Sequence, residues 1–122
     1  MQQAKSTTRT SQFDIKTQLK EFIIEQIEDM KAKEIIIIDV SDTSDVTDTM
    51  IICTGNSKRH VRSIAEQTAL AAKNAGDQPL GVEGLEGSEW VLVDLGNVIL
   101  HVMQAETREF YQLENLWEQS AQ

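Results

Sequence analysis

The first half of the chain predicts one amphipathic helix followed by two buried strands. Between Leu19 and Met30, apolar residues recur at helical spacing with Lys and Glu between them, which is typical of a helix that packs one face inward. Asp14 or Thr17 is the expected N-cap. The apolar, β-branched run Glu34–Val40 predicts a strand buried on both faces, and Met50–Thr54 predicts a second buried strand.

A second helix follows the turn Gly55-Asn56-Ser57, with Asn56 or Ser57 as its N-cap. Its end is expected near Gly76, because glycine suits the left-handed position that follows a helix. Pro79, just beyond, fits this boundary. The residues expected on its buried face are Val61, Ile64, Ala65, Thr68 and Ala72.

The second half predicts a glycine-punctuated stretch, a hairpin and a last helix. The stretch Gly81–Gly87 leads into strands at Glu89–Asp94 and Val98–Met103, and the intervening Leu95-Gly96 favours an antiparallel hairpin. The final helix, Ala105–Trp117, would place Phe110, Leu113 and Trp117 on one side.

These elements indicate a single domain of the α/β (α+β) class, because neither a linker nor an internal repeat interrupts them. The polar segment 1–16 is expected to be a disordered lead-in, 17–118 the folded domain and 119–122 a tail.

The hairpin has two chemically different faces. A two- or four-residue turn would pair Val93 with Val98 and Trp90 with His101. One face is then entirely aliphatic and suits a core: Val91, Val93, Val98, Leu100 and Val102. The other face is mixed: Trp90, Leu92, Asp94, Asn97, Ile99, His101 and Met103. This composition favours a protein interface, although Trp90 could equally cover a helix of its own domain.

Charge and cysteine usage narrow the class of protein. Twenty acidic and 11 basic residues give a net charge of -9, which disfavours general binding to phosphate backbones and favours a basic protein as partner. Acidity could also serve only solubility. The single cysteine, Cys53, forms no internal disulfide, and the polar start of the chain resembles no signal peptide, so we expect a cytoplasmic protein. The apolar runs are too short to span a membrane.

Side chains that could carry chemistry are sparse. His60 and His101, with one cysteine, are too few for a metal site of recognised spacing, and the glycines at 81, 84 and 87 lack the Gly-Lys-Ser/Thr end of a phosphate loop. Four aspartates, Asp39, Asp42, Asp45 and Asp48, are interpreted as turn residues rather than magnesium ligands. We therefore expect no cofactor and no catalytic residue.

A basic cluster opens the second helix: Lys58, Arg59, His60 and Arg62. Cations and the helix dipole together could hold an anion there. The cluster could also be an ordinary solvated first turn.

Several segments resemble, in the same order, the ribosomal silencing factor family, also called the Iojap or RsfS family. The resemblance covers about residues 17–118. The segments that carry it are Asp48–Gly55, Ser57–Val61, Gly81–Gly84, Trp90–Gly96, Val98–Met103 and Tyr111–Trp117.

The resemblance implies a mixed β-sheet flanked by helices, with a topology related to nucleotidyltransferases but without their activity. It implies a translation repressor that binds the large ribosomal subunit through its protein number fourteen and blocks association with the small subunit, notably under nutrient limitation. Matching positions give five partner-binding residues: Trp90, Leu95, His101, Met103 and Tyr111. Lys58, Arg59 and Arg62 are candidates for secondary contacts to ribosomal RNA.

Further expectations concern the hairpin and the alternatives. Asp94 and Gly96 would shape the turn, and Asn97 stands where the family usually has Asp, which removes one charge. An exposed apolar hairpin face also predicts a homodimer. The alternative function is a magnesium-dependent nucleotidyltransferase that uses Gly55, Ser57 and carboxylates such as Asp39 and Asp94.

Overall fold

Five strands form one mixed sheet in the order β1-β2-β5-β4-β3. The computed structural model describes residues 14, 15 and 17–116. The strands are β1 (Lys33–Asp39), β2 (Thr49–Gly55), β3 (Gly81–Glu83), β4 (Trp90–Asp94) and β5 (Val98–Gln104). The central pair β2–β5 is parallel and the other pairs are antiparallel, which confirms the predicted mixed sheet.

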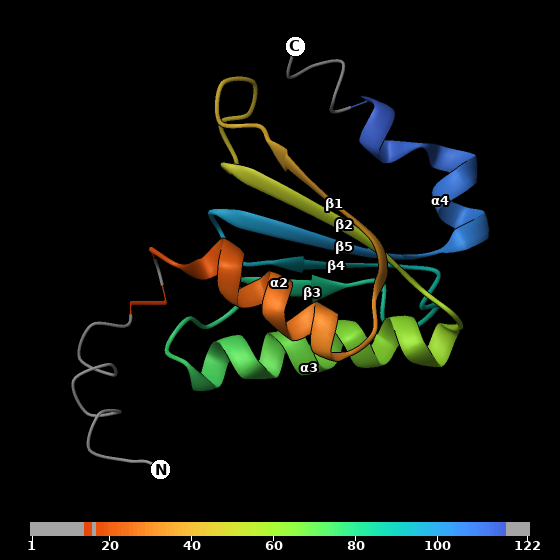
Figure 1. Ribbon diagram of the computed structural model, residues 1–122, viewed down its shortest axis with the longest axis horizontal. Coiled ribbons are helices and arrows are strands. Elements are labelled where there is room, and N and C mark those ends of the chain that lie inside the picture. The colour runs from red at the N-terminus through yellow and green to blue at the C-terminus, as the bar shows by residue number, and fades with distance from the viewer. Residues whose placement is uncertain (1–13, 16, 117–122) are drawn as a thin grey trace.

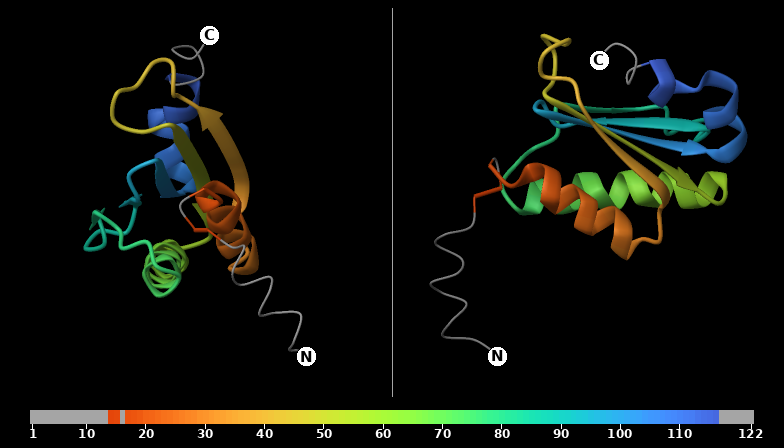
Figure 2. Two further views of the ribbon diagram at one scale, coloured as in Figure 1. Left: turned by 90° about the vertical axis from the view of Figure 1, so that its left-hand side faces the viewer. Right: turned by 45° about the horizontal axis from the view of Figure 1, so that its top comes forward.

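The helices cover the two faces of the sheet unequally. They are α2 (Leu19–Asp29), α3 (Lys58–Asn74) and α4 (Ala105–Tyr111). Figures 1 and 2 show α2 and α3 together on one face, whereas α4 lies on the opposite side at one end. The face opposite α2 and α3 is therefore only partly covered by helix.

The main core lies between the sheet and the pair α2–α3. The side chains that α3 buries are those predicted from its spacing: Val61, Ile64, Ala65, Thr68 and Ala72. Ser57 is the N-cap, since its side chain accepts a hydrogen bond from the backbone N–H of His60. Gly76 follows the helix with φ +106°, a conformation that glycine adopts without steric cost.

The hairpin faces are as predicted, but its register differs by two residues. Trp90 pairs with Met103 and Val93 with Leu100, rather than with His101 and Val98. The turn has one of the two expected lengths: the Leu95 N–H donates to the Val98 carbonyl, which leaves a two-residue loop in which Gly96 has φ +86°. The Asp94 carboxylate accepts the Gly96 N–H, as the resemblance implied. Because side chains alternate with period two, a two-residue shift leaves every side chain on its predicted face.

Strand β1 is not buried on both faces as predicted, because it forms one edge of the sheet. Ile37 is 46% exposed, and the register shifts between Lys33 and Ile36, beside Glu34 with φ +51°. A run of four isoleucines satisfies the sequence criterion for a buried strand, but the faces of a strand are buried only where other layers of the domain cover them. The opposite edge, β3, falls in the glycine-punctuated stretch Gly81–Gly87, for which no strand was predicted.

The start of the first helix also differs from the prediction. Helix α2 starts after Gln18, which makes no side-chain capping bond, so neither Asp14 nor Thr17 is the N-cap. Ile15, which we assigned to the lead-in, is buried in the main core. Residues 1–13 and 16 of the lead-in, and the predicted tail, lie outside the described residues.

The last helix is interrupted rather than continuous. Helix α4 stops at Tyr111, Gln112 is left-handed at φ 49°, and a separate helical turn spans 113–116. The predicted alignment of Phe110 with Leu113 is therefore wrong: Phe110 is 80% exposed, whereas Leu113 packs on the sheet. The expected third member, Trp117, lies outside the described residues.

We expect Gly84→Ala to destabilise the fold by about 2–4 kcal/mol, because Gly84 has φ +92° and an added Cβ would overlap the Trp90 carbonyl. Gly87→Ala is the matched control, since nothing lies within 4 Å of its Cβ position. Urea unfolding measures both. Equal midpoints for the two variants would contradict the observed loop geometry.

Candidate functional site

The sheet face opposite α2 and α3 carries a second, smaller apolar cluster. Its buried members are Ile38, Val40, Met50, Ile52 and Met103, with Ile36, Trp90 and Leu113 packed against them. Helix α4 and the turn after it cover one end of this face (Figure 2). Aromatic side chains gather at this covered end.

Four rings from three elements form this aromatic cluster: Trp90 of β4, His101 of β5, and Phe110 and Tyr111 of α4. The Trp90 ring centroid lies 5.0 Å from that of Tyr111 and 5.9 Å from that of His101. Phe110 meets Tyr111 edge-on, with 4.9 Å between centroids. Trp90 is half-buried, whereas Phe110 and Tyr111 are 80% and 56% exposed. In this cluster, the buried His101 and the half-buried Trp90 lie beneath the exposed rings of Phe110 and Tyr111.

His101 fixes the orientation of Trp90. The indole Nε1–H of Trp90 donates to His101 Nδ1 at 2.9 Å, so the neutral imidazole carries its proton on Nε2. Burial lowers the pKa of His101 to about 4, because the charged ring would lose its hydration. His101 Nε2 is itself buried with no hydrogen-bond partner. The ring therefore positions Trp90 in its neutral form.

Arg108, which is not among the residues predicted from the sequence, anchors α4 to the sheet. The guanidinium is only 5% exposed; its Nη1 donates to the Glu34 carbonyl at 2.7 Å and to Thr54 Oγ1 at 2.8 Å. Its Nε pairs with Glu114 at 3.1 Å. An arginine in an amphipathic helix is typical of a solvated face, so only the approach of β1 and β2 reveals this role.

The five predicted partner-binding residues do not form one cluster. Trp90, His101, Met103 and Tyr111 lie at the α4 end, but His101 and Met103 are buried there. Leu95 lies at the opposite end of β4, where it lines a separate hollow of about 410 Å³. The atoms available to a partner therefore belong mainly to Tyr111 and Trp90, and to Phe110, which position-matching did not select.

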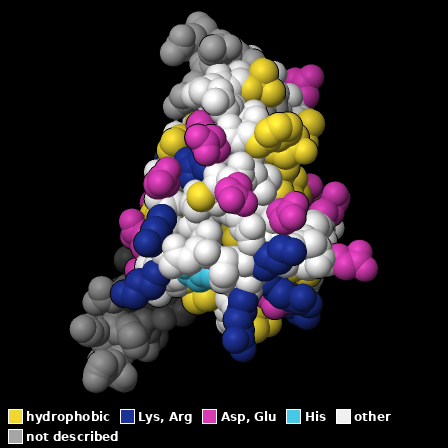
Figure 3. Space-filling view, turned by 90° about the vertical axis from the view of Figure 1, so that its right-hand side faces the viewer, with side chains coloured by type: hydrophobic (Ala, Val, Ile, Leu, Met, Phe, Trp, Pro, Cys, Tyr) yellow, Lys and Arg dark blue, Asp and Glu magenta, His cyan; other side chains and the backbone are white. Residues whose placement is uncertain are grey.

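The predicted basic cluster lies at the same end of the molecule as α4, because the parallel strands β2 and β5 end side by side at Gly55 and Gln104. Figure 3 views this end: hydrophobic side chains gather in its upper part, and Lys and Arg side chains in its lower part. Lys58 and Arg59 are exposed, and Arg62 pairs with Glu66 at 3.4 Å.

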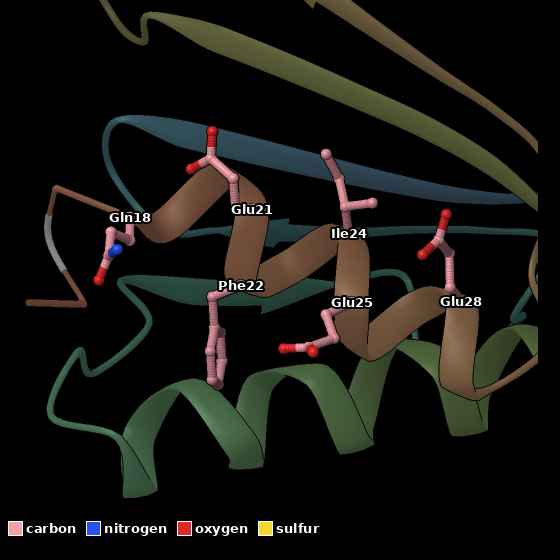
Figure 4. Close-up of a pocket in the computed structure, with 6 residues that line it drawn as sticks. All are labelled: Gln18, Glu21, Phe22, Ile24, Glu25 and Glu28. Atoms are coloured by element: carbon pink, nitrogen blue, oxygen red, sulfur yellow. The ribbon is translucent and has the colours of Figure 1, made fainter. Parts of the chain in front are cut away.

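A hollow of about 430 Å³ beside α2 carries a different set of groups. Figure 4 shows its six labelled residues along α2 and its N-cap: Gln18, Glu21, Phe22, Ile24, Glu25 and Glu28. Glutamates spaced along the exposed face of one helix do not converge on a single point. Within residues 14, 15 and 17–116, no three His, Cys, Asp or Glu side chains are grouped to hold a metal ion.

The described residues thus define a small α+β domain whose distinctive surface is aromatic and apolar. In that same part of the chain, no helix is long and apolar enough to cross a membrane. Residues 14–122 match the family model described as "Ribosomal silencing factor during starvation".

Relatives agree over most of the chain. A ribosomal silencing factor of Haemophilus influenzae is 44% identical over 81% of this chain and 97% of its own. One from Chromobacterium violaceum is 41% identical, over 82% of each chain. A mouse protein named "Mitochondrial assembly of ribosomal large subunit protein 1" is 30% identical over 88% of this chain and 46% of its own.

Solved structures show the same fold. A crystal structure of a Chromobacterium violaceum protein superposes with a TM-score of 0.82 at 40% identity, covering 87% of this chain and 88% of that one. The chain therefore belongs to the ribosomal silencing factor family, whose role is ribosome-related regulation of translation.

Folding stability should decrease as the pH falls below about 6.5, because the unfolded chain then protonates His101 whereas the native site resists protonation until about pH 4. The loss attributable to this residue is about 3 kcal/mol over that window. The substitution His101→Asn should abolish this loss of stability, and the asparagine amide oxygen can still accept the Trp90 N–H. Urea unfolding between pH 7 and pH 4.5 compares the two proteins.

His60→Gln is the control for this titration, and it should retain the part of the pH dependence due to His101. Parallel stability curves for the wild type and His101→Asn would show that the buried imidazole does not titrate as the structure indicates.

Proposed function

We propose that this protein binds the large ribosomal subunit through its protein number fourteen, prevents association with the small subunit and so represses translation. The observation that carries the proposal is the aromatic surface at the α4 end, where Phe110 and Tyr111 are exposed over Trp90. Family membership supports a ribosome-related role, and we expect the protein to act in the cytoplasm.

The aromatic surface suits protein recognition because its parts are already ordered. Tyr111 rests on Trp90, which is held by His101, while Arg108 fixes the helix to β1 and β2. A preorganised surface loses little conformational freedom on binding. Tyrosine and tryptophan also provide large contact areas and often dominate the binding energy of interfaces.

Charge around the aromatic cluster favours a basic partner. Glu106 and Glu109 are exposed on α4 beside the aromatic residues, and the whole chain carries -9. Such a rim accelerates encounter with a positively charged surface more than it adds affinity. The proposed mechanism is steric: the docked domain occupies the surface that the small subunit needs, and no covalent bond changes.

The arrangement of carboxylates argues against the nucleotidyltransferase alternative. Asp39 ends β1 and Asp94 ends β4, with β2 and β5 between them, so the strands that carry them are about 14 Å apart. Two-metal catalysis requires ligands that converge on ions about 4 Å apart. Gly55 and Ser57 lie at the other end of the sheet, since Gly55 pairs with Gln104 whereas Asp94 pairs with Ile99.

Tyr111→Ala should weaken binding to purified large subunits by at least about tenfold, because the exposed ring is an anchor that truncation removes. Phe110→Ala should act in the same direction. Light scattering should then show that subunits reassociate in the presence of either variant. Leu70→Ala, an exposed apolar residue on α3, is the matched control.

Wild-type subunit binding by Tyr111→Ala, or unchanged subunit joining with saturating wild-type protein, would contradict the proposal. We also propose that any homodimer uses this aromatic surface. Sedimentation should then show the Tyr111→Ala variant as the more monomeric protein.

A further inference from the structure

We propose that four cations, Lys31, Lys33, Lys58 and Arg59, form a second contact that binds the phosphate backbone of ribosomal RNA. We call these four residues the basic patch. The inference rests on the proposed function, because it assumes docking on a ribosomal subunit. It adds Lys31 and Lys33, which are distant in sequence from the cluster at the start of α3.

Hydrogen bonds hold the two parts of the patch together. His60 Nδ1 accepts the backbone N–H of Asn56 at 2.8 Å, and His60 Nε2 lies 2.8 Å from the Met30 carbonyl. The imidazole therefore joins the start of α3 to the turn that carries Lys31. Lys33 pairs with Thr54 in the sheet. It lines a hollow of about 340 Å³ together with Asn56, and Glu34 and Glu106 lie at the same hollow.

The four cations form no ion pair within the part of the chain that the structure describes. All four are exposed, whereas Arg62, Arg108 and Lys20 each pair with a glutamate. Figure 3 shows Lys and Arg side chains gathered in the lower part of this end, with Asp and Glu side chains above and beside them. At physiological salt the Debye length is about 8 Å, so carboxylates farther from the patch than this distance are largely screened.

Two of the cations stand where they reduce the stability of the isolated protein. The first turn of α3 contains no acidic residue and begins with Lys58 and Arg59. The positive end of the helix dipole disfavours cations in this position. A bound anion would relieve that repulsion, which explains why an acidic protein keeps two cations there.

The position of the patch favours RNA as its partner. The patch and the aromatic cluster lie at the same end of the domain, because β2 and β5 end side by side at Gly55 and Gln104 (Figure 1). A domain docked through Tyr111 would thus turn its cations toward the subunit. The surface of a ribosomal subunit is rich in RNA phosphate, for which unpaired Lys and Arg are suited.

The test compares the double variant Lys58→Gln/Arg59→Gln with the control Lys73→Gln, a neutralisation in the last turn of the same helix. Binding of each full-length protein to purified large subunits is measured from 50 to 300 mM salt. Loss of two phosphate contacts should make the negative slope of log K against log salt shallower by about one to two. Affinity at 150 mM salt should fall about tenfold, while Lys73→Gln matches the wild type.

Thermal unfolding separates this effect from misfolding. The double variant should melt about 2–4 °C higher than the wild type, since it removes two cations from the positive end of α3. Higher stability combined with weaker binding is an outcome that a folding defect cannot produce. A lower melting temperature would contradict the dipole argument. The double variant Lys31→Gln/Lys33→Gln tests the RNA contact independently of the helix dipole, because neither residue lies in α3.

Isolated ribosomal protein fourteen distinguishes RNA from protein as the partner of the patch. Both double variants should bind it as the wild type does, whereas Tyr111→Ala should not. Equal salt slopes for the double variants and Lys73→Gln, or weakened binding to the isolated protein, would overturn this inference and leave the docking proposal intact. Failure of wild-type protein to bind large subunits would instead overturn the proposed function.

Discussion

The guanidinium of Arg108 is the interaction on which the exposed surface of this domain depends. It bonds to the Glu34 carbonyl of β1, to Thr54 of β2 and to the Glu114 carboxylate. Removing one partner from a buried, hydrogen-bonded charge typically costs about 3–5 kcal/mol. Because α4 has only seven residues, it is too short to be stable alone. The buried cation therefore determines where Phe110 and Tyr111 lie.

This anchoring connects the edge of the sheet to the aromatic surface. Glu34 lies at the register shift in β1, where φ is +51°, and its carbonyl accepts a hydrogen bond from Arg108. The irregular backbone of an edge strand thus becomes an attachment point for a helix. Three residues further along α4, Tyr111 rests on Trp90, which His101 orients. The short helix is thus attached to the sheet at two positions, so its exposed rings form an ordered contact surface.

The two proposed contacts share one physical feature: each departs from what stability alone would favour. Phe110 exposes 80% of an aromatic side chain to water, and Lys58 and Arg59 oppose the dipole of α3. Departures from local rules tend to mark functional positions. Both departures lie at the end where the parallel strands β2 and β5 stop. An aromatic contact would give affinity, while neighbouring cations would give a salt-dependent second contact.

The sequence determined those features that depend on periodicity and local turn chemistry. The buried face of α3, its Ser57 cap, its end at Gly76 and the aliphatic face of the hairpin all follow from spacing along one segment. Even the two-residue error in hairpin register left the faces correct, because strand side chains alternate with period two.

Only the tertiary structure decided which surfaces stay exposed and which distant residues meet. Four isoleucines in β1 look like a buried strand until the sheet order places them at an edge. The sequence context of Arg108 predicts a solvated side chain, but β1 and β2 surround it in the fold. Leu95 and Tyr111 were predicted to bind the same partner, but Leu95 lies at the opposite end of β4. Burial and proximity are properties of the assembled layers, so no single segment of the chain encodes them.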